Sequence, residues 1–151
     1  LNMLALTALS KRFLKPMIQR GRGHIVNLAS LAADQPGGPG FAVYYATKSY
    51  VLSFSKTLAL ELRGSGIHVS AVCPGPVATA FKDRSGAADS WLYRLPKNTP
   101  EKIAGSVCRA IKSHRSVVLP GIFSKFLAFA GEMPPRRIAL EVNNLLLRSS
   151  R

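Results

Sequence analysis

The chain has 151 residues, 47% of them hydrophobic, and its 21 Lys and Arg against 7 Asp and Glu give a net charge of +14. This length and composition predict one folded domain and argue against two domains or a disordered chain. The charge could indicate a nucleic-acid partner, but the basic residues are scattered in runs no longer than Lys11-Arg12 and Arg136-Arg137. We therefore expect a solvated basic surface and no nucleic-acid binding.

The two cysteines, Cys73 and Cys108, stand alone, with no Cys-x-x-Cys pair and no histidine at ligand spacing. Neither a metal site nor a disulfide is predicted, and a reducing, cytoplasmic setting is the default expectation. The residues that follow Leu1 already have the pattern of an amphipathic helix. We therefore expect a fragment of a longer protein, whose targeting signals would lie outside this chain.

The first part of the chain predicts a helix, a strand and a loop. Apolar residues at helical spacing predict a helix over residues 2–19, which Pro16 should kink and Gly21 should end. A β-branched run predicts a buried strand over residues 24–30. Residues 34–40 are rich in proline and glycine and predict a loop.

A second helix is predicted over residues 43–63 and a second strand over residues 67–73. Strand, helix and strand in this order predict a parallel, right-handed βαβ unit. Ser30 ends the first strand, and the Pro74-Gly75 turn follows the second. Both therefore lie at carboxyl ends of parallel strands, the edge at which open α/β sheets bind ligands.

The remaining residues predict a flap, a helix, a strand and a helical end. Residues 78–98 have no clear period and are expected to form a mobile flap. Thr99 as N-cap and Pro100 at the first position predict a third helix. Residues 116–119 predict a third strand, and residues 122–151 predict two helical stretches too short to span a bilayer. The expected buried face of the third helix carries Ile103, Val107 and Ile111.

A Tyr-x-x-x-Lys pair, Tyr44 and Lys48, opens the second predicted helix. Residues four apart stack on one helical face, so the Lys48 ammonium can lie beside the Tyr44 phenol. A nearby ammonium lowers the pKa of a phenol from about 10, which makes Tyr44 a candidate general acid and base. Tyr45 is a poor candidate because Ser49 lies four residues after it. The structural alternative is a half-buried tyrosine beside a lysine whose stem lies along apolar surface.

Four motifs follow one another along the chain: Asn2 in the first helix, the strand Ile-Val-Asn-Leu-Ala-Ser that ends at Ser30, the sequence Tyr44-Tyr-Ala-Thr-Lys48, and the turn Pro-Gly-Pro-Val-Ala-Thr over residues 74–79. In this order and spacing they resemble the C-terminal half of a short-chain dehydrogenase/reductase.

The resemblance implies an α/β fold that is part of a Rossmann-type, doubly wound parallel sheet, with about three strands and flanking helices. Residues 1–121 would be the C-terminal catalytic half of the dehydrogenase domain. Residues 122–151 would be a C-terminal helical extension of the same domain.

The resemblance also implies a role for each motif residue. Tyr44 would exchange a proton with the oxygen of an alcohol/carbonyl pair as hydride is transferred. Lys48 would bind the nicotinamide ribose, Ser30 would orient the reacting oxygen, and Asn2 would hold, through its helix, a water that links the lysine to solvent. The implied cofactor-binding set is Tyr44, Lys48, Pro74, Gly75, Val77 and Thr79.

The implied cofactor is NAD or NADP. The Gly-rich phosphate loop of the family and the residue that distinguishes the two dinucleotides would precede Leu1, so the isolated chain is expected to bind cofactor poorly and to be inactive. Apolar residues between Phe81 and Leu95 suggest an apolar substrate such as an acyl chain, a steroid or a retinoid-like molecule. The family often pairs its helices across a dimer, and an apolar second face of the 43–63 helix agrees with a homo-oligomer.

Two other hypotheses stay open: a catalytically inactive fragment with a bare sheet edge, and a non-enzymatic interaction or regulatory module with the same fold. The intact Ser30, Tyr44 and Lys48 favour an enzyme. Contact of residues 123–129 with a membrane surface is the weakest hypothesis. The histidines are separately placed, without a nucleophile beside them, and are expected to be structural or surface residues: His24, His68 and His114.

Overall fold

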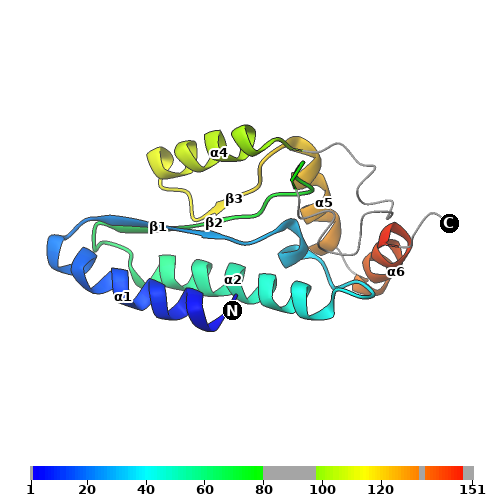
Figure 1. Cartoon of the computed structure of the whole chain (residues 1–151), viewed down its shortest axis with the longest axis horizontal. Helices are drawn as coiled ribbons and strands as arrows, with labels where there is room; N and C mark the ends of the chain where they lie inside the picture. The colour runs from blue at the N-terminus through cyan, green and yellow to red at the C-terminus, as the bar shows by residue number, and fades with distance from the viewer. Residues whose placement is uncertain (1, 80–97, 133–134, 148–151) are drawn as a thin grey trace.

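The computed structural model describes residues 2–79, 98–132 and 135–147. They form a sheet of three strands with helices on both faces (Figure 1). The predicted α/β class is thus confirmed. The expected flap falls almost entirely on residues 80–97, outside the described residues. The strands are parallel and adjacent in the order β1 (Gly23–Leu28), β2 (Ile67–Val72) and β3 (Val117–Val118).

Strands β1 and β2 pair residue for residue, from Gly23 opposite Ile67 to Leu28 opposite Val72. The ladder continues past the strands, because the Ala29 N–H donates to the Val72 carbonyl at 2.9 Å and the Leu31 N–H donates to the Pro74 carbonyl at 2.8 Å. The chain segments that leave the two strands are therefore held together at the carboxyl edge of the sheet.

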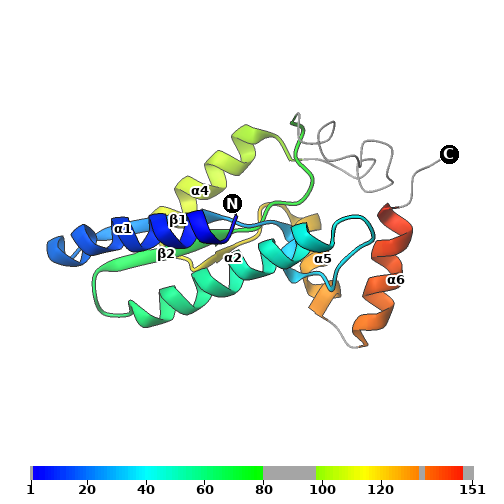
Figure 2. The same cartoon turned by 60° about the horizontal axis from the view of Figure 1, so that its bottom comes forward.

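Helices α1 (Leu4–Arg20) and α2 (Ala42–Glu61) lie side by side on one face of the sheet (Figure 2). The hydroxyls of Thr7 and Tyr50 are 2.8 Å apart and link the two helices. Helix α1 continues past Pro16 and ends at Gly21 with a left-handed φ of 64°, a backbone conformation that glycine adopts easily.

The core lies between the sheet and α2. The buried Asn27 of β1 donates to the Ser55 hydroxyl at 2.9 Å, and Ser55 donates to the Val51 carbonyl at 2.7 Å. Each of these buried polar side chains thus has a hydrogen-bond partner, as is usual in a tightly packed interior. The core cluster consists of Ala29, Val51, Leu52, Ala71 and Cys73.

Helix α4 (Pro100–Ser113) covers the other face of the sheet. Its predicted N-terminus is confirmed, because the Thr99 hydroxyl accepts from the Lys102 N–H at 3.3 Å. The predicted buried face is partly wrong. Ile111 is 40% exposed, while Ser106 and Ala110 are buried. Small side chains let the helix approach the sheet closely, so the helix turns its small residues inward.

A short 3₁₀ helix η1 (Leu31–Asp34) follows β1, and helix α5 (Ile122–Glu132) packs against it. Helix α6 (Arg136–Leu147) packs against α5, so the two predicted C-terminal helical stretches are confirmed. Figure 1 shows both helices beyond the carboxyl ends of the strands. No helix in the described ranges has the length and apolarity needed to cross a membrane.

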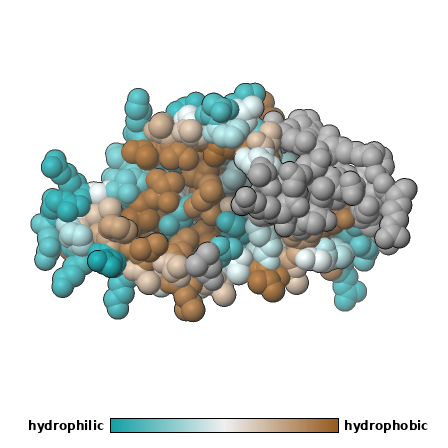
Figure 3. Space-filling model, viewed as in Figure 1, coloured by the Kyte–Doolittle hydropathy of each residue, from teal (hydrophilic) through white to brown (hydrophobic). Residues whose placement is uncertain are grey.

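Strand β1 is an edge of the described sheet. Figure 3 shows an apolar surface between α4 and the α1–α2 layer, where this edge lies, and Leu28 in β1 is 56% exposed. An apolar edge strand of this kind normally pairs with, or is covered by, further polypeptide.

Candidate active site

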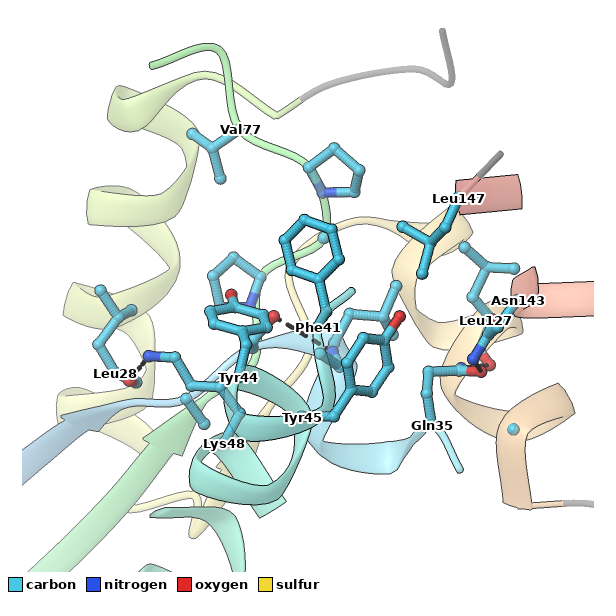
Figure 4. A pocket seen from close by; sticks show the side chains of 18 of the residues that line it. Leu28, Gln35, Phe41, Tyr44, Tyr45, Lys48, Val77, Leu127, Asn143 and Leu147 are labelled. Atoms are coloured by element: carbon cyan, nitrogen blue, oxygen red, sulfur yellow. Dashed lines mark hydrogen bonds between the residues drawn. The ribbon is translucent and has the colours of Figure 1, made fainter. Parts of the chain in front are cut away.

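All eight candidate site residues line one cavity of about 1090 Å³. It lies at the carboxyl ends of β1 and β2, between the start of α2, helix α4 and the α5–α6 pair, and Figure 4 shows part of its lining. The segments that supply these residues are separate in sequence, so the tertiary fold brings them together. The eight residues are Asn2, Ser30, Tyr44, Lys48, Pro74, Gly75, Val77 and Thr79.

Tyr44 and Lys48 lie one turn apart near the start of α2 (Figure 4). The Lys48 Nζ is 5.8 Å from the centre of the Tyr44 ring and donates to the Leu28 carbonyl at 2.9 Å. Burial lowers the pKa of Lys48, and the nearby Cys73 thiol opposes that shift. Because an ammonium has three N–H groups, the bond to Leu28 orients Lys48 without using all its donors.

The neighbouring Tyr45 packs edge-on against Tyr44, with ring centres 6.3 Å apart. Burial raises the pKa of Tyr45 to about 12, and proximity to Tyr44 adds to this shift. A phenol with this pKa is a poor proton donor and acceptor near neutral pH. Burial therefore makes Tyr45 a poor candidate for proton transfer, and the acid–base role of Tyr44 stays a prediction.

Ser30 follows β1 at the mouth of the cavity. Its extended backbone makes it the N-cap of η1, and its hydroxyl accepts from the Ala32 N–H at 3.2 Å. The bond from the Leu31 N–H to the Pro74 carbonyl holds this loop against the turn that follows β2. The Ser30 side chain is thus positioned by bonds on both sides of it.

Asn2 lies in a turn before α1 and not inside the helix, which corrects the expectation from sequence. Its Nδ2 approaches the Thr47 hydroxyl at 3.4 Å, and Thr47 donates to the Tyr44 carbonyl at 2.9 Å. Asn2 therefore reaches α2 at the residue next to Lys48. The water-holding role of Asn2 stays a prediction.

The turn after β2 is held by a second segment. Val77 forms an isolated parallel bridge with Asn98, in which the Asn98 N–H donates to the Pro76 carbonyl and the Ala78 N–H donates to the Asn98 carbonyl. In extended backbone the N–H and C=O groups of successive residues point to opposite sides. Because Pro76 and Ala78 bond to Asn98, the N–H and C=O of Val77 point away from Asn98. The Thr79 N–H donates to the Val77 carbonyl at 2.9 Å.

Gly75 lies where α5 meets this turn. A Cβ at Gly75 would lie 2.8 Å from the Ser124 hydroxyl, closer than real Cβ atoms approach other atoms. A larger residue here would require the Ser124 side chain to move, so the turn and α5 pack closely at the cavity.

No motif in the sequence pointed to the apolar side of the cavity. Gln35 and Asn143, which also line it, were missed because they are 108 residues apart and belong to no motif. The apolar lining comes mainly from Phe41 on the approach to α2, Ile103 and Val107 on α4, Leu127 on α5, and Ile138, Val142 and Leu147 on α6.

Residues 1–90 match the sequence model of the short chain dehydrogenase family. The chain belongs to this family. Ketoacyl reductase HetN of Nostoc sp. is 35% identical over 123 residues, which cover 78% of this chain and 40% of HetN. The chain thus spans less than half the length of that relative.

Two solved members of the short-chain dehydrogenase family have similar folds. A Sphingobium yanoikuyae enzyme in complex with NADPH is 30% identical, with a TM-score of 0.72 over 87% of this chain and 51% of that one. A Burkholderia phymatum enzyme in complex with NAD is 26% identical, with a TM-score of 0.74 over 85% of this chain and 53% of that one. These matches support the Rossmann-type assignment.

The histidines of this short-chain dehydrogenase are not separately placed, which corrects the expectation from sequence. His24 of β1 is opposite His68 of β2, and the rings of His68 and His114 stack at 3.7 Å. His24 Nε2 lies 2.8 Å from the Ser70 hydroxyl, which donates to the Arg115 carbonyl. Since Ser70 uses its proton on that carbonyl, His24 Nε2 is the donor to Ser70. Parallel pairing and the C-terminus of α4 bring the three rings together.

The cysteines of this family member are both free thiols. Burial raises the pKa of Cys73 to about 12, with the charge of Asp34 as a second cause, while Cys108 is exposed. Within the described ranges no group of three or more His, Cys, Asp or Glu is arranged to hold a metal ion.

Proposed function

We propose that this chain carries the catalytic half of an NAD(P)-dependent oxidoreductase that interconverts an alcohol and a carbonyl. The observation that carries the proposal is the convergence of Ser30, Tyr44 and Lys48 on one cavity at the carboxyl edge of a parallel sheet. Membership of the short-chain dehydrogenase family and the match to a ketoacyl reductase support it.

In the direction of carbonyl reduction, the Ser30 hydroxyl would donate a hydrogen bond to the substrate oxygen and orient it towards Tyr44. Tyr44 would give its phenolic proton to that oxygen as hydride reaches the carbon. The Lys48 ammonium would stabilise the phenolate that remains. In the opposite direction the phenolate would take the proton from the alcohol. A bound nicotinamide dinucleotide would supply or accept the hydride.

The residues on this edge fit a nicotinamide and its ribose. The Lys48 ammonium can donate to ribose hydroxyls, and the Val77 backbone faces away from Asn98 on the cavity-lining turn, where a carboxamide could bond to it. Thr79 adds a hydroxyl to the same lining. Because the two solved relatives described above are in complex with NADPH and with NAD, we propose either dinucleotide as the cofactor. The phosphates would be bound by polypeptide that also pairs with the exposed β1 edge.

We also propose a homodimer in which α1 and α2 form the interface. These helices are linked side by side through Thr7 and Tyr50, and they expose large apolar side chains. A stable dimer would bury these side chains, and sedimentation as a monomer at micromolar concentration would contradict it. The exposed set is Leu4 on α1 and Val43 and Leu60 on α2.

The proposed function is tested with the protein expressed from its complete reading frame. Nicotinamide absorbance is followed with a panel of alcohols and ketones for wild type and Tyr44→Phe. We expect the variant to lose a factor of about 100 to 10,000 in kcat, the usual contribution of general acid–base catalysis. The matched control is Tyr45→Phe, which removes the adjacent phenol and should retain far more activity. Equal turnover by wild type and Tyr44→Phe would refute the mechanism.

A further inference from the structure

The cavity has a cluster of polar side chains at one end, and most of the rest of its lining is apolar. Ser30, Tyr44 and Lys48 form the polar end. In Figure 4, Leu147 of α6 lies on the side of the cavity away from this end, and Phe41 packs edge-on against Tyr44 with ring centres 6.3 Å apart. A ligand whose oxygen lies at Tyr44 would therefore place the rest of its body against hydrocarbon. At about 1090 Å³ the cavity has room for such a body beside a nicotinamide ring.

The apolar wall of the cavity is formed by Leu127 of α5 and by Ile138, Val142 and Leu147 of α6. Gln35 joins this wall to the loop that carries Ser30 (Figure 4). Its Nε2 donates to the Leu127 carbonyl of α5 at 2.6 Å, and its Oε1 accepts from the Asn143 Nδ2 of α6 at 3.3 Å. Asn143 also donates to the Gly37 carbonyl at 2.9 Å and is only 7% exposed. One amide side chain thus holds both helices against the same loop.

Two glycines show how closely the wall and the loop are packed. A Cβ at Gly131 of α5 would lie 2.5 Å from the Gln35 Nε2 and 2.7 Å from the Asp34 carbonyl. At Gly38 the Leu147 side chain of α6 occupies the place that a Cβ would take. The distance between the loop that carries Ser30 and the apolar wall is therefore set by direct contact.

We propose that the substrate of this site is an apolar secondary alcohol or its ketone, with its hydrocarbon body against α5 and α6, and that Gln35 and Asn143 are positioning residues that set the distance from this wall to Tyr44. The inference rests on the proposed function, since it takes Tyr44 as the group that meets the substrate oxygen. The residues from Phe81 to Leu95, which suggested an apolar substrate in the sequence, lie outside the described residues, and the α5–α6 wall is a separate reason for the same substrate class.

The substrate class is tested with straight-chain ketones from butan-2-one to decan-2-one and the protein from its complete reading frame. Each buried methylene adds about 0.8 kcal/mol of binding, so kcat/KM should rise up to roughly fourfold per added methylene until the wall is filled. Ala139→Trp, which adds bulk to the α6 lining, should end this rise at a shorter chain. If kcat/KM of the wild type did not change with the chain length of the ketone, the proposed substrate class would be overturned.

The positioning role is tested with Asn143→Ala and Asn144→Ala, two neighbours on α6. Asn144 lies outside the cavity lining and contacts Glu141. We expect Asn143→Ala to raise KM for decan-2-one about tenfold and KM for butan-2-one much less, and Asn144→Ala to leave both KM values unchanged. Gln35→Met, which keeps the length but not the hydrogen bonds, is the second variant if Asn143→Ala does not fold. Equal effects on long and short ketones, or equal effects of the two asparagine variants, would overturn this role.

A binding experiment separates this inference from the proposed function. Tyr44→Phe keeps the apolar wall, so displacement of 1-anilinonaphthalene-8-sulfonate from this variant reports binding without turnover. Stronger displacement by decan-2-one than by butan-2-one would support the apolar site even if no alcohol or ketone is turned over, in which case the proposed function alone fails. Turnover without any dependence on chain length would leave the proposed function standing and overturn the inference.

Discussion

The Lys48 ammonium is bonded to the Leu28 carbonyl at 2.9 Å, which ties the second turn of α2 to the end of β1. This bond sets the position of the lysine before any ligand is bound. A side chain held in this way loses little further freedom when it binds a cofactor or stabilises a phenolate.

Lys48→Met should therefore reduce kcat/KM by about 100-fold or more, because the neighbouring Tyr44 loses the charge that stabilises its phenolate. The lost bond to Leu28 should lower the free energy of unfolding by about 1 kcal/mol. Lys56→Met is the matched control, since Lys56 is exposed two turns further along α2. Steady-state kinetics and urea unfolding measure the two effects. Similar losses of activity in both variants would contradict a specific role for Lys48.

The histidine cluster predicts loss of stability in acid. Burial lowers the pKa of His24 below its usual 6.5, and the charges of His68 and His114 add to this shift. Below about pH 6.5 the unfolded chain therefore binds a proton at this position more readily than the folded chain does. The stability contributed by neutral His24 is present above pH 6.5 and is lost as the pH falls towards its lowered pKa.

His24→Gln should weaken this pH dependence, because glutamine can donate to Ser70 but does not titrate. The measurement is the midpoint of urea unfolding at pH 7.5 and at pH 5.5 for the wild type and for His24→Gln. We expect a smaller difference between the two pH values in the variant. An unchanged difference would show that other groups cause the acid sensitivity.

Gly66→Ala should destabilise the protein more than Gly64→Ala. Both glycines have left-handed backbone, with φ of 75° and 80°, so either alanine costs about 1–2 kcal/mol of strain. At Gly66 the Gly21 carbonyl occupies the place of the new Cβ, whereas nothing lies within 4 Å of a Cβ at Gly64. The difference between the unfolding free energies of the two variants measures the cost of the clash between the new Cβ at Gly66 and the Gly21 carbonyl. Equal values would mean that the backbone relaxes and removes the clash.

The two cysteines should differ in reactivity. Cys73 is fully buried with a pKa of about 12, whereas Cys108 is exposed. Because the thiolate is the reactive form, iodoacetamide at pH 8 should modify Cys108 and leave Cys73 unmodified. Peptide mass spectrometry after brief labelling measures this, and labelling in urea should add Cys73. Early modification of Cys73 without urea would show that the core opens at the end of β2.

Several of these features follow from local sequence. Helical spacing, the stops at Gly21 and Gly64, and the Thr99 cap predicted the elements to within about two residues, since they depend on backbone preferences within a few residues. The parallel βαβ order predicted that Ser30 and the Pro74 turn share one edge of the sheet. The roles of these residues in catalysis stay predictions.

Other features depended on packing between distant segments. The face that α4 buries was predicted incorrectly at Ile111, because the small residue Ala110 permits closer approach to the sheet. The histidine cluster was missed because His24 and His114 are 90 positions apart in the sequence and meet only through strand pairing and the end of a helix.

The sequence by itself determined the strands, the helices and the Tyr44–Lys48 pair, because helical period and turn residues act over short distances along the chain. Only the tertiary structure decided which side chains face Tyr44 across the cavity. The bond between Gln35 and Asn143 joins residues 108 positions apart. No local preference encodes such a contact, because it exists only after α5 and α6 pack against the loop that follows β1.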